Sequence, residues 1–155
     1  MTTDIEIKGL SELQALLDEL PTTMEVKVVR GGLRAAAKVI EAEAKRLCPM
    51  GRTGLLRSSI HTTMRSKRGH ITATVKAGGK EAWYAHFVEY GTSRHFIKPK
   101  NRKSLFLAGL ERKVADHPGA QRKPFMRPAI DAKRDEATVA MAEYIRNRID
   151  KLMNR

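Results

Sequence analysis

Apolar positions recur at helical spacing near the N-terminus and predict two helices there. Leucines follow Ser11 at intervals of three and four residues, and Pro21 ends this first helix. The second helix is predicted from Thr22 to about Leu47, because Pro49 prevents it from continuing. Its predicted apolar face is Val26, Val29, Leu33, Ala37, Ile40, Ala44 and Leu47.

Two glycines, Gly31 and Gly32, lie inside this second helix. Each costs about 1 kcal/mol of helix stability relative to alanine. They therefore predict either a kink or a place where another backbone approaches closely.

The C-terminal part of the chain predicts a long final helix. Pro128 suits its first position, because a proline there loses no helical hydrogen bond. The helix is expected to end near Leu152. Its predicted apolar face is Ala137, Met141, Tyr144, Ile145, Ile149 and Leu152.

Between residues 59 and 77 the apolar period changes to two, which is typical of strands. A turn at "SKRG" divides this stretch and predicts an antiparallel hairpin with one half-polar side. The apolar side is Ile60, Thr62 and Met64 before the turn and Ile71, Ala73, Val75 and Ala77 after it.

The stretch "YAHFVEYGTSRHF", residues 84–96, predicts a short aromatic helix that ends at Gly91. Tyr84, Phe87 and Tyr90 are expected to anchor this helix on the sheet. Further on, "SLFLAGLERKVA" fits either two short strands or a helix, and the strands are favoured. Residues 94–123 are thus interpreted as a basic projecting arm or as an ordinary surface hairpin.

Together these elements predict an α+β fold in one domain, residues 1–155. Its order is two N-terminal helices, a small mostly antiparallel sheet, a short aromatic helix and a long C-terminal helix. Cys48 is the single cysteine, so an internal disulfide is excluded and a reducing compartment is expected. Neither a signal-peptide core nor a run of about 18 apolar residues occurs, so a chain made in the cytoplasm and away from membranes is expected.

The net charge of +13 is concentrated in the middle of the chain. Residues 45–80 contain nine Lys or Arg and no Asp or Glu, and residues 94–127 contain ten against two. Such clustering predicts a polyanionic partner. The alternative is a solvated face that only keeps the protein in solution.

Candidate chemistry is sparse. His86 and Glu89 lie three residues apart on the short helix, the spacing of an acid–base pair, but such spacing is common on surface helices. The sequence has no nucleophile elbow, phosphate-binding loop or metal-ligand spacing. It therefore predicts no enzyme, with no catalytic, cofactor-binding or metal-binding residues, and Cys48 as a small buried side chain.

Glu89 is an isolated acid in a basic region. It is expected to form a buried or interfacial ion pair, with Arg57 and Arg127 as first candidates. The alternative is an exposed Glu89.

Three segments in this order resemble the neck or tail-completion proteins of long-tailed double-stranded DNA phages and prophages, also called minor tail or head–tail joining proteins. They are "CPMGRTGLLRSSI" (48–60), "YAHFVEYGTSRHF" (84–96) and "HPGAQRKPFMRPAI" (117–130). The matching positions are Pro49, Thr53, Gly54, Leu56, Arg57, Ser59, Ile60, Tyr84, Ala85, Val88, Glu89, Gly91, Thr92, Pro124, Phe125, Arg127, Pro128 and Ala129.

The resemblance implies a structural virion protein at the head–tail junction, without enzymatic activity or cofactor. It implies a homo-oligomeric ring, usually of six subunits, around the channel that DNA crosses. Partners would be a head-side connector or stopper protein and a tail-terminator or tail-tube protein. Contacts with DNA or a neighbour are expected at Arg94, Lys98, Lys100, Arg102, Lys103, Arg112 and Lys113.

The alternative function is that of a free nucleic-acid-binding protein without sequence specificity. A sequence-reading protein would present a recognition helix with Arg, Asn or Gln, or an aromatic platform on a sheet. Here the aromatic residues gather in one short helix beside Glu89. This arrangement favours the structural function.

Overall fold

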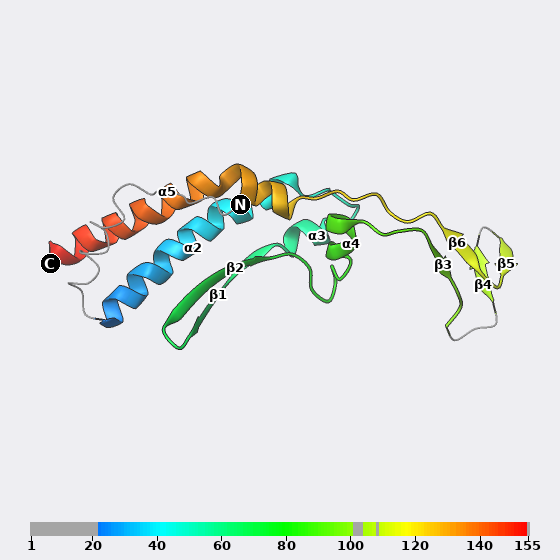
Figure 1. The fold of residues 1–155 in the computed structure, drawn as a ribbon, viewed down its shortest axis with the longest axis horizontal. Coiled ribbons are helices and arrows are strands. Elements are labelled where there is room, and N and C mark those ends of the chain that lie inside the picture. Colours follow the sequence, from blue (N-terminus) through cyan, green and yellow to red (C-terminus); the bar gives the residue numbers. More distant parts are fainter. Residues whose placement is uncertain (1–21, 101–103, 108, 155) are drawn as a thin grey trace, which may run out of the picture.

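The computed structural model describes residues 22–100, 104–107 and 109–154. The predicted first helix lies outside these residues. Two long helices lie side by side, a β-hairpin runs beneath one of them, and an arm extends from the end opposite the C-terminus (Figure 1). The fold is α+β, as the sequence predicts.

The predicted second helix is confirmed as α2, Thr22–Leu47. The predicted final helix is confirmed as α5, Met126–Met153, but it begins two residues earlier than expected. Pro128 therefore occupies the third helical position. This is tolerated because the first turn of a helix has no internal partner for its N–H groups, so the proline removes no hydrogen bond.

Helix α2 continues through Gly31 and Gly32 without a break. A Cβ atom on Gly32 would lie 2.8 Å from Cγ1 of Ile145, and one on Gly31 would collide with the ring of Tyr144. The glycines thus allow close approach, but of side chains from α5 rather than of its backbone.

The predicted apolar face of α2 is only partly right. Val28 is buried, whereas Val26 is exposed, and Glu41 and Glu43 are buried as well. The reason is that α2 is covered by α5 on one side and by the hairpin on another. A helix enclosed in this way buries residues outside the single stripe that sequence periodicity detects.

The predicted hairpin is confirmed as β1, His61–Lys67, paired with β2, His70–Lys76. Met64 lies opposite Ala73, and side chains on this face are half-buried toward α2. Arg68 and Gly69 form the turn, both with positive φ angles. Within the described residues the strands form three separate antiparallel pairs instead of one sheet.

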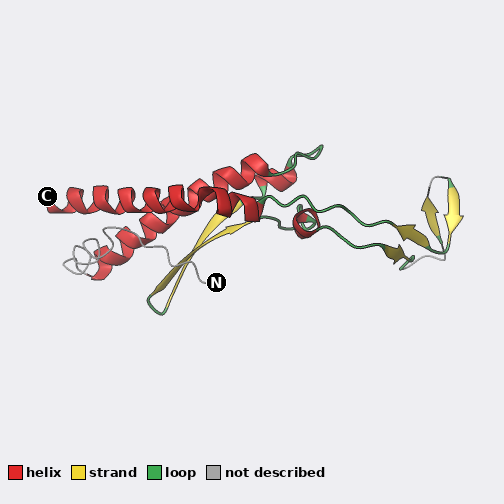
Figure 2. Cartoon of the chain, turned by 45° about the horizontal axis from the view of Figure 1, so that its top comes forward, coloured by secondary structure: helices red, strands yellow, loops and turns green. Residues whose placement is uncertain are grey.

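The arm consists of two such pairs. Strand β3, His95–Ile97, pairs with β6, Ala115–His117, and β4, Leu105–Leu107, pairs with β5, Leu110–Arg112. Both pairs lie far from the long helices, and extended segments connect them to α4, Ala85–Tyr90, and back to α5 (Figures 1 and 2).

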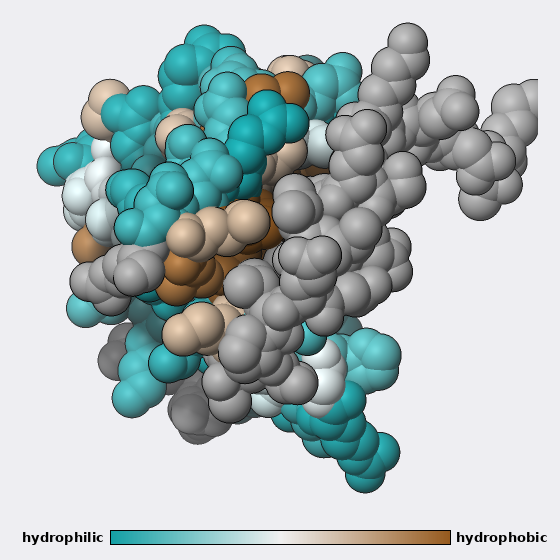
Figure 3. Space-filling view, turned by 90° about the vertical axis from the view of Figure 1, so that its left-hand side faces the viewer, coloured by the Kyte–Doolittle hydropathy of each residue, from teal (hydrophilic) through white to brown (hydrophobic). Residues whose placement is uncertain are grey.

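Two apolar clusters support the body of the molecule. One joins α2 to the C-terminal half of α5 through Val28, Ile145 and Ile149. Seen from the end where α5 finishes, the coloured surface is mostly hydrophilic, with an apolar area near its centre (Figure 3). No helix in the described part of the chain is both long and apolar enough to cross a membrane.

Candidate functional site

The second apolar cluster brings together the three segments that carry the family resemblance. Leu56 and Ile60 come from the first segment, Ala85 from the second, and Phe125 and Ala129 from the third. Phe125 and Ile60 are almost completely buried. We call this cluster the motif junction; its buried residues are Ala44, Cys48, Leu56, Ile60, Ala82, Ala85, Phe125 and Ala129.

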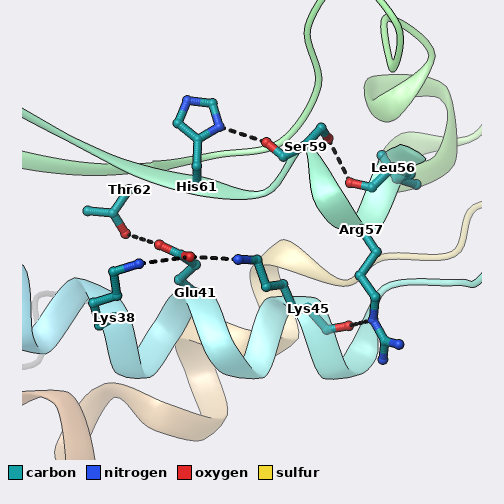
Figure 4. Close-up of polar contacts among 8 residues, drawn as sticks. All are labelled: Lys38, Glu41, Lys45, Leu56, Arg57, Ser59, His61 and Thr62. Atoms are coloured by element: carbon teal, nitrogen blue, oxygen red, sulfur yellow. Dashed lines mark hydrogen bonds and ion pairs between the residues drawn. The ribbon is translucent and has the colours of Figure 1, made fainter. Parts of the chain in front are cut away.

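The first segment closes the end of α2. Gly54, with φ 65°, precedes the short helix α3, Leu55–Ser58. Arg57 then reaches back, and its Nε donates a hydrogen bond of 2.6 Å to the carbonyl oxygen of Lys45 (Figure 4). Carbonyls in the last turn of a helix have no internal partner, so Arg57 stabilises the C-terminus of α2.

Ser59 connects α3 to the loop that follows the hairpin. Its hydroxyl donates to the carbonyl of Leu56 at 2.6 Å and accepts from the backbone N–H of Gly78 at 2.9 Å. One side chain thereby links the end of α3 to the loop that follows the hairpin.

Glu89 connects the second and third segments, and it is buried as expected. The predicted arginine partner is wrong. One carboxylate oxygen accepts from the backbone N–H groups of Phe125 at 2.8 Å and Met126 at 3.0 Å, and the other accepts from that of Arg127 at 3.2 Å. These groups form the N-terminus of α5, whose partial positive charge favours a carboxylate.

The two predicted partners of Glu89 are engaged elsewhere. Arg57 caps α2, and Nε of the exposed Arg127 lies 3.9 Å from Asp131 on its own helix. The sequence pattern points to charged side chains as partners, but it does not reveal that a helix N-terminus offers several N–H donors at once.

The same region fixes the root of the arm, where residues 91–93 leave the body and residues 119–123 return. The N–H of Lys123 donates to the carbonyl of Val88 at 2.8 Å, and Thr92 and Ala120 exchange two backbone hydrogen bonds. A Cβ atom on Gly91, whose φ is 74°, would lie 2.7 Å from the carbonyl oxygen of Ala120. Glycine is therefore required where the two segments cross.

The burial of the aromatic residues in and beside α4 differs from the prediction. Tyr84 and Val88 pack against the motif junction, but Phe87 is exposed, and Tyr90 is 79% exposed. The expected anchoring by Phe87 and Tyr90 is wrong. The six-residue helix instead turns Ala85 and Glu89 inward, because the carboxylate must reach the start of α5.

The exposed side of α4 and the root of the arm enclose an open groove of about 670 Å³. It is lined mainly by aromatic and imidazole rings, including Phe87, Tyr90, His86, His95 and His117. Exposed aromatic surface of this kind is typical of contacts between proteins. No group of three or more potential metal ligands lies together among the residues that the structure describes.

The arm combines basic with apolar side chains. Arg94 forms a bidentate ion pair with Asp116, which holds the pKa of that carboxyl below its usual range. Phe96, Phe106 and Leu110 are exposed. Of the remaining predicted contact residues, Lys98, Lys100, Arg112 and Lys113 are exposed, and Arg102 and Lys103 lie outside the described residues.

The sequence did not predict a polar network between α2 and the hairpin. Glu41 accepts hydrogen bonds from Lys45 at 2.7 Å, Lys38 at 3.1 Å and the hydroxyl of Thr62 at 2.6 Å (Figure 4). Burial alone raises the pKa of Glu41, but these three hydrogen bonds and the charge of Lys45 outweigh it and lower the pKa to about 2. The network attaches β1 to α2.

The other positions of the resemblance lie at the edges of the motif junction. Pro49 and Pro128 are half-buried, and Thr53 and Pro124 are exposed. Cys48 is buried as predicted. Burial raises the pKa of its thiol, although the nearby Arg57 opposes this effect.

Comparison with known proteins defines the class of this chain. The model of a family described as "Bacteriophage HK97-gp10, putative tail-component" matches residues 11–91, more than half of the chain. The chain belongs to this family, which confirms the resemblance to phage tail-completion proteins. It is thus a structural component of a phage tail, a part of the virion that contacts other virion proteins. No curated protein and no solved structure matches the chain.

The matched range begins before α2 and ends at Gly91, where the arm leaves the body. It includes the first segment, the hairpin and α4. The arm and α5 lie beyond it, yet Glu89 and Phe125 join the matched and unmatched parts directly.

Proposed function

We propose that this chain completes the junction between the head and the tail of a long-tailed phage. Six copies would form a ring around the DNA channel, with a head-side connector or stopper protein on one side and a tail-terminator or tail-tube protein on the other. The observation that carries the proposal is the arm: it has exposed apolar residues at its far end and a root fixed to the motif junction.

The arm suits contacts between subunits. Phe106 is 76% exposed and Phe96 67% exposed, which is unfavourable for side chains that stay in water. An arm that reaches a different surface of the next copy makes a heterologous contact, and such contacts close into rings when the rotation between subunits permits. The groove beside α4, with its exposed Tyr90, offers a second apolar surface for assembly.

The role is architectural and not enzymatic. Both carboxylate oxygens of Glu89 are engaged by the backbone of α5, so Glu89 is not available as an acid–base partner. His86 directs Nδ1 to the carbonyl of Trp83 at 3.0 Å and lies on the exposed side of α4. The stretch 84–96, which resembles an active site in composition, therefore serves as a structural joint.

The charge of the chain fits a channel for DNA. Six copies with a net charge of +13 each carry roughly +78 before counterions. A basic channel holds phosphates without reading sequence, and its grip weakens with salt.

Disruption of the gene in the phage tests the proposal. Filled heads and complete tails are expected to accumulate separately, and the wild-type protein supplied in trans is expected to restore infectious particles. Joined, infectious particles in the absence of the protein would contradict the proposed function.

A further inference from the structure

The outer face of the β1–β2 hairpin consists of polar and basic side chains. The register places Arg65 opposite Thr72 and Lys67 opposite His70, and alternation puts all four on the side away from α2. The apolar residues Met64 and Val75 lie on the other side. The complete outer face is His61, Thr63, Arg65, Lys67, His70, Thr72, Thr74 and Lys76.

Among the described residues, the positive charge of this face has no acidic counterpart at ion-pair distance. The sequence from 44 to 80 contains no Asp or Glu. Throughout the described ranges, no carboxylate lies within ion-pair distance of Arg65, Lys67, Arg68 or Lys76. An open hollow of about 340 Å³ lies among the first three of these side chains, His70 and Thr72.

The turn adds a further arginine under strain. Arg68 has φ 52°, a left-handed conformation that costs an L-residue roughly 1–2 kcal/mol. Two-residue hairpin turns favour Asn, Asp or Gly at such positions. Arg68 thus occupies an unfavourable conformation at the tip of the hairpin, which projects away from the long helices (Figure 2). Strain of this kind is characteristic of functional positions.

The hairpin and the arm differ in surface chemistry. The arm contains Asp116 and Glu111 and several exposed large apolar residues. In contrast, no large apolar side chain is exposed within 61–76, all of which the structure describes. The arm fits a protein surface, whereas the hairpin fits a polyanion.

We infer that the outer face of the β1–β2 hairpin binds the phosphate backbone of double-stranded DNA and is the element that faces the channel. Arg, Lys and Thr side chains are common donors to phosphate oxygens, and such contacts carry no sequence information. A two-stranded ribbon also has the width to enter a major groove. The position in a channel rests on the proposed function, but the contact with DNA does not.

The test measures binding of the purified full chain to a short fluorescent DNA duplex over a range of salt concentrations. The test variant combines three substitutions: Arg65→Gln, Lys67→Gln and Arg68→Gln. It is expected to reduce the slope of the logarithm of the binding constant against the logarithm of the salt concentration by about 2–3, because each lost phosphate contact contributes about 0.9. The matched control removes three charges from the arm, by Lys98→Gln, Arg112→Gln and Lys113→Gln. It is expected to change the slope by less than about 1.

A single variant separates loss of binding from loss of structure. Arg68→Gly removes one charge and also relieves the left-handed strain. It is expected to reduce the slope by about 1 while the melting temperature stays equal or rises. The inference is overturned if the wild type does not bind DNA, if the triple hairpin variant keeps its slope, or if the arm control loses as much.

Two further measurements complete the test. The first distinguishes DNA from an acidic protein as the partner of this face. The second distinguishes failure of the inference from failure of the proposed function. Polyglutamate at equal charge is expected to compete poorly; competition equal to that of DNA would assign the face to an acidic protein and overturn the inference. In the phage, the triple hairpin variant is expected to join heads to tails. If heads and tails join in the absence of this protein, the proposed function fails, whereas the DNA-binding result is unaffected.

Discussion

The carboxylate of Glu89 lies 2.8 Å from the backbone nitrogen of Phe125, although 36 residues separate them in the chain. Glu89 lies just before the arm, and Phe125 lies just after it. The same carboxylate also accepts from Met126 and Arg127, so one buried side chain caps α5 and closes the base of the arm.

Replacement of Glu89 by Gln is expected to destabilise the fold by about 2–4 kcal/mol. Gln keeps the shape, but its amide group has one acceptor oxygen and places N–H donors against N–H donors of α5. Urea unfolding measures the difference. Glu81→Gln, at an exposed position before α4, is the matched control and is expected to change stability by less than about 0.5 kcal/mol.

Charge reversal by Glu89→Lys is also expected to block head–tail joining, because it separates the arm from α5. The variant is tested by complementation of the disrupted gene. A Glu89→Lys protein that melts like the wild type and supports normal assembly would show that the cap is dispensable.

Gly32→Ala is expected to destabilise by about 1–3 kcal/mol, despite the better helix propensity of alanine. The new methyl group would press on Ile145, which is only 1% exposed. The methyl group of Gly31→Ala would press on the half-exposed Tyr144, whose ring can rotate into solvent. A smaller loss of stability than for Gly32→Ala is therefore expected. Combined with Tyr144→Ala, Gly31→Ala is expected to become stabilising by up to about 1 kcal/mol relative to Tyr144→Ala alone. Equal costs for both glycine variants in thermal unfolding would rule out this packing account.

The Glu41 network predicts a pH dependence of stability. Its pKa is lowered from 4.5 to about 2 in the folded protein. The stabilisation is therefore complete above about pH 4.5, the value in the unfolded chain, and is lost as the pH falls toward 2. Glu41→Gln is expected to be less stable at pH 7 by on the order of 1–2 kcal/mol, allowing for solvent around the exposed lysines.

The difference between wild type and Glu41→Gln is expected to shrink between pH 5 and pH 3. Urea unfolding at a series of pH values measures it, and the exposed Glu143→Gln serves as the control for loss of a carboxylate. A difference that stays constant down to pH 3 would mean that the charge of Glu41 does not stabilise the fold.

The arm is expected to be the first site of tryptic cleavage in the free protein. Lys100, Arg112 and Lys113 are exposed and far from the body. In assembled particles these sites are expected to be protected by the neighbouring subunits. Mass spectrometry of the early fragments measures this, and cleavage that is equally fast or equally slow in both states would exclude the arm from subunit contacts.

Much of the fold could be predicted from local patterns. The bounds of α2 follow from Pro21 and Pro49, and the hairpin follows from its period of two. These signals act over a few residues. The face of α2 was predicted less well, because the burial of Glu41 depends on Thr62 in a strand twenty-one residues away.

The candidate site was harder to predict for the same reason. Burial of Glu89 followed from its isolation among basic residues, but its partner did not. The N–H groups of α5 become available only when Phe125 packs into the motif junction. Likewise, the exposure of Tyr90 follows from the rotation of α4 that Glu89 imposes, which no local aromatic pattern records.

Cryo-electron microscopy of the intact particle at the head–tail junction would show where this chain lies. We expect a ring of six copies between head and tail, with the arm of each copy against its neighbour and the β1–β2 hairpin turned toward the channel. A junction built entirely from other proteins, or this chain located elsewhere in the tail, would contradict the proposed function.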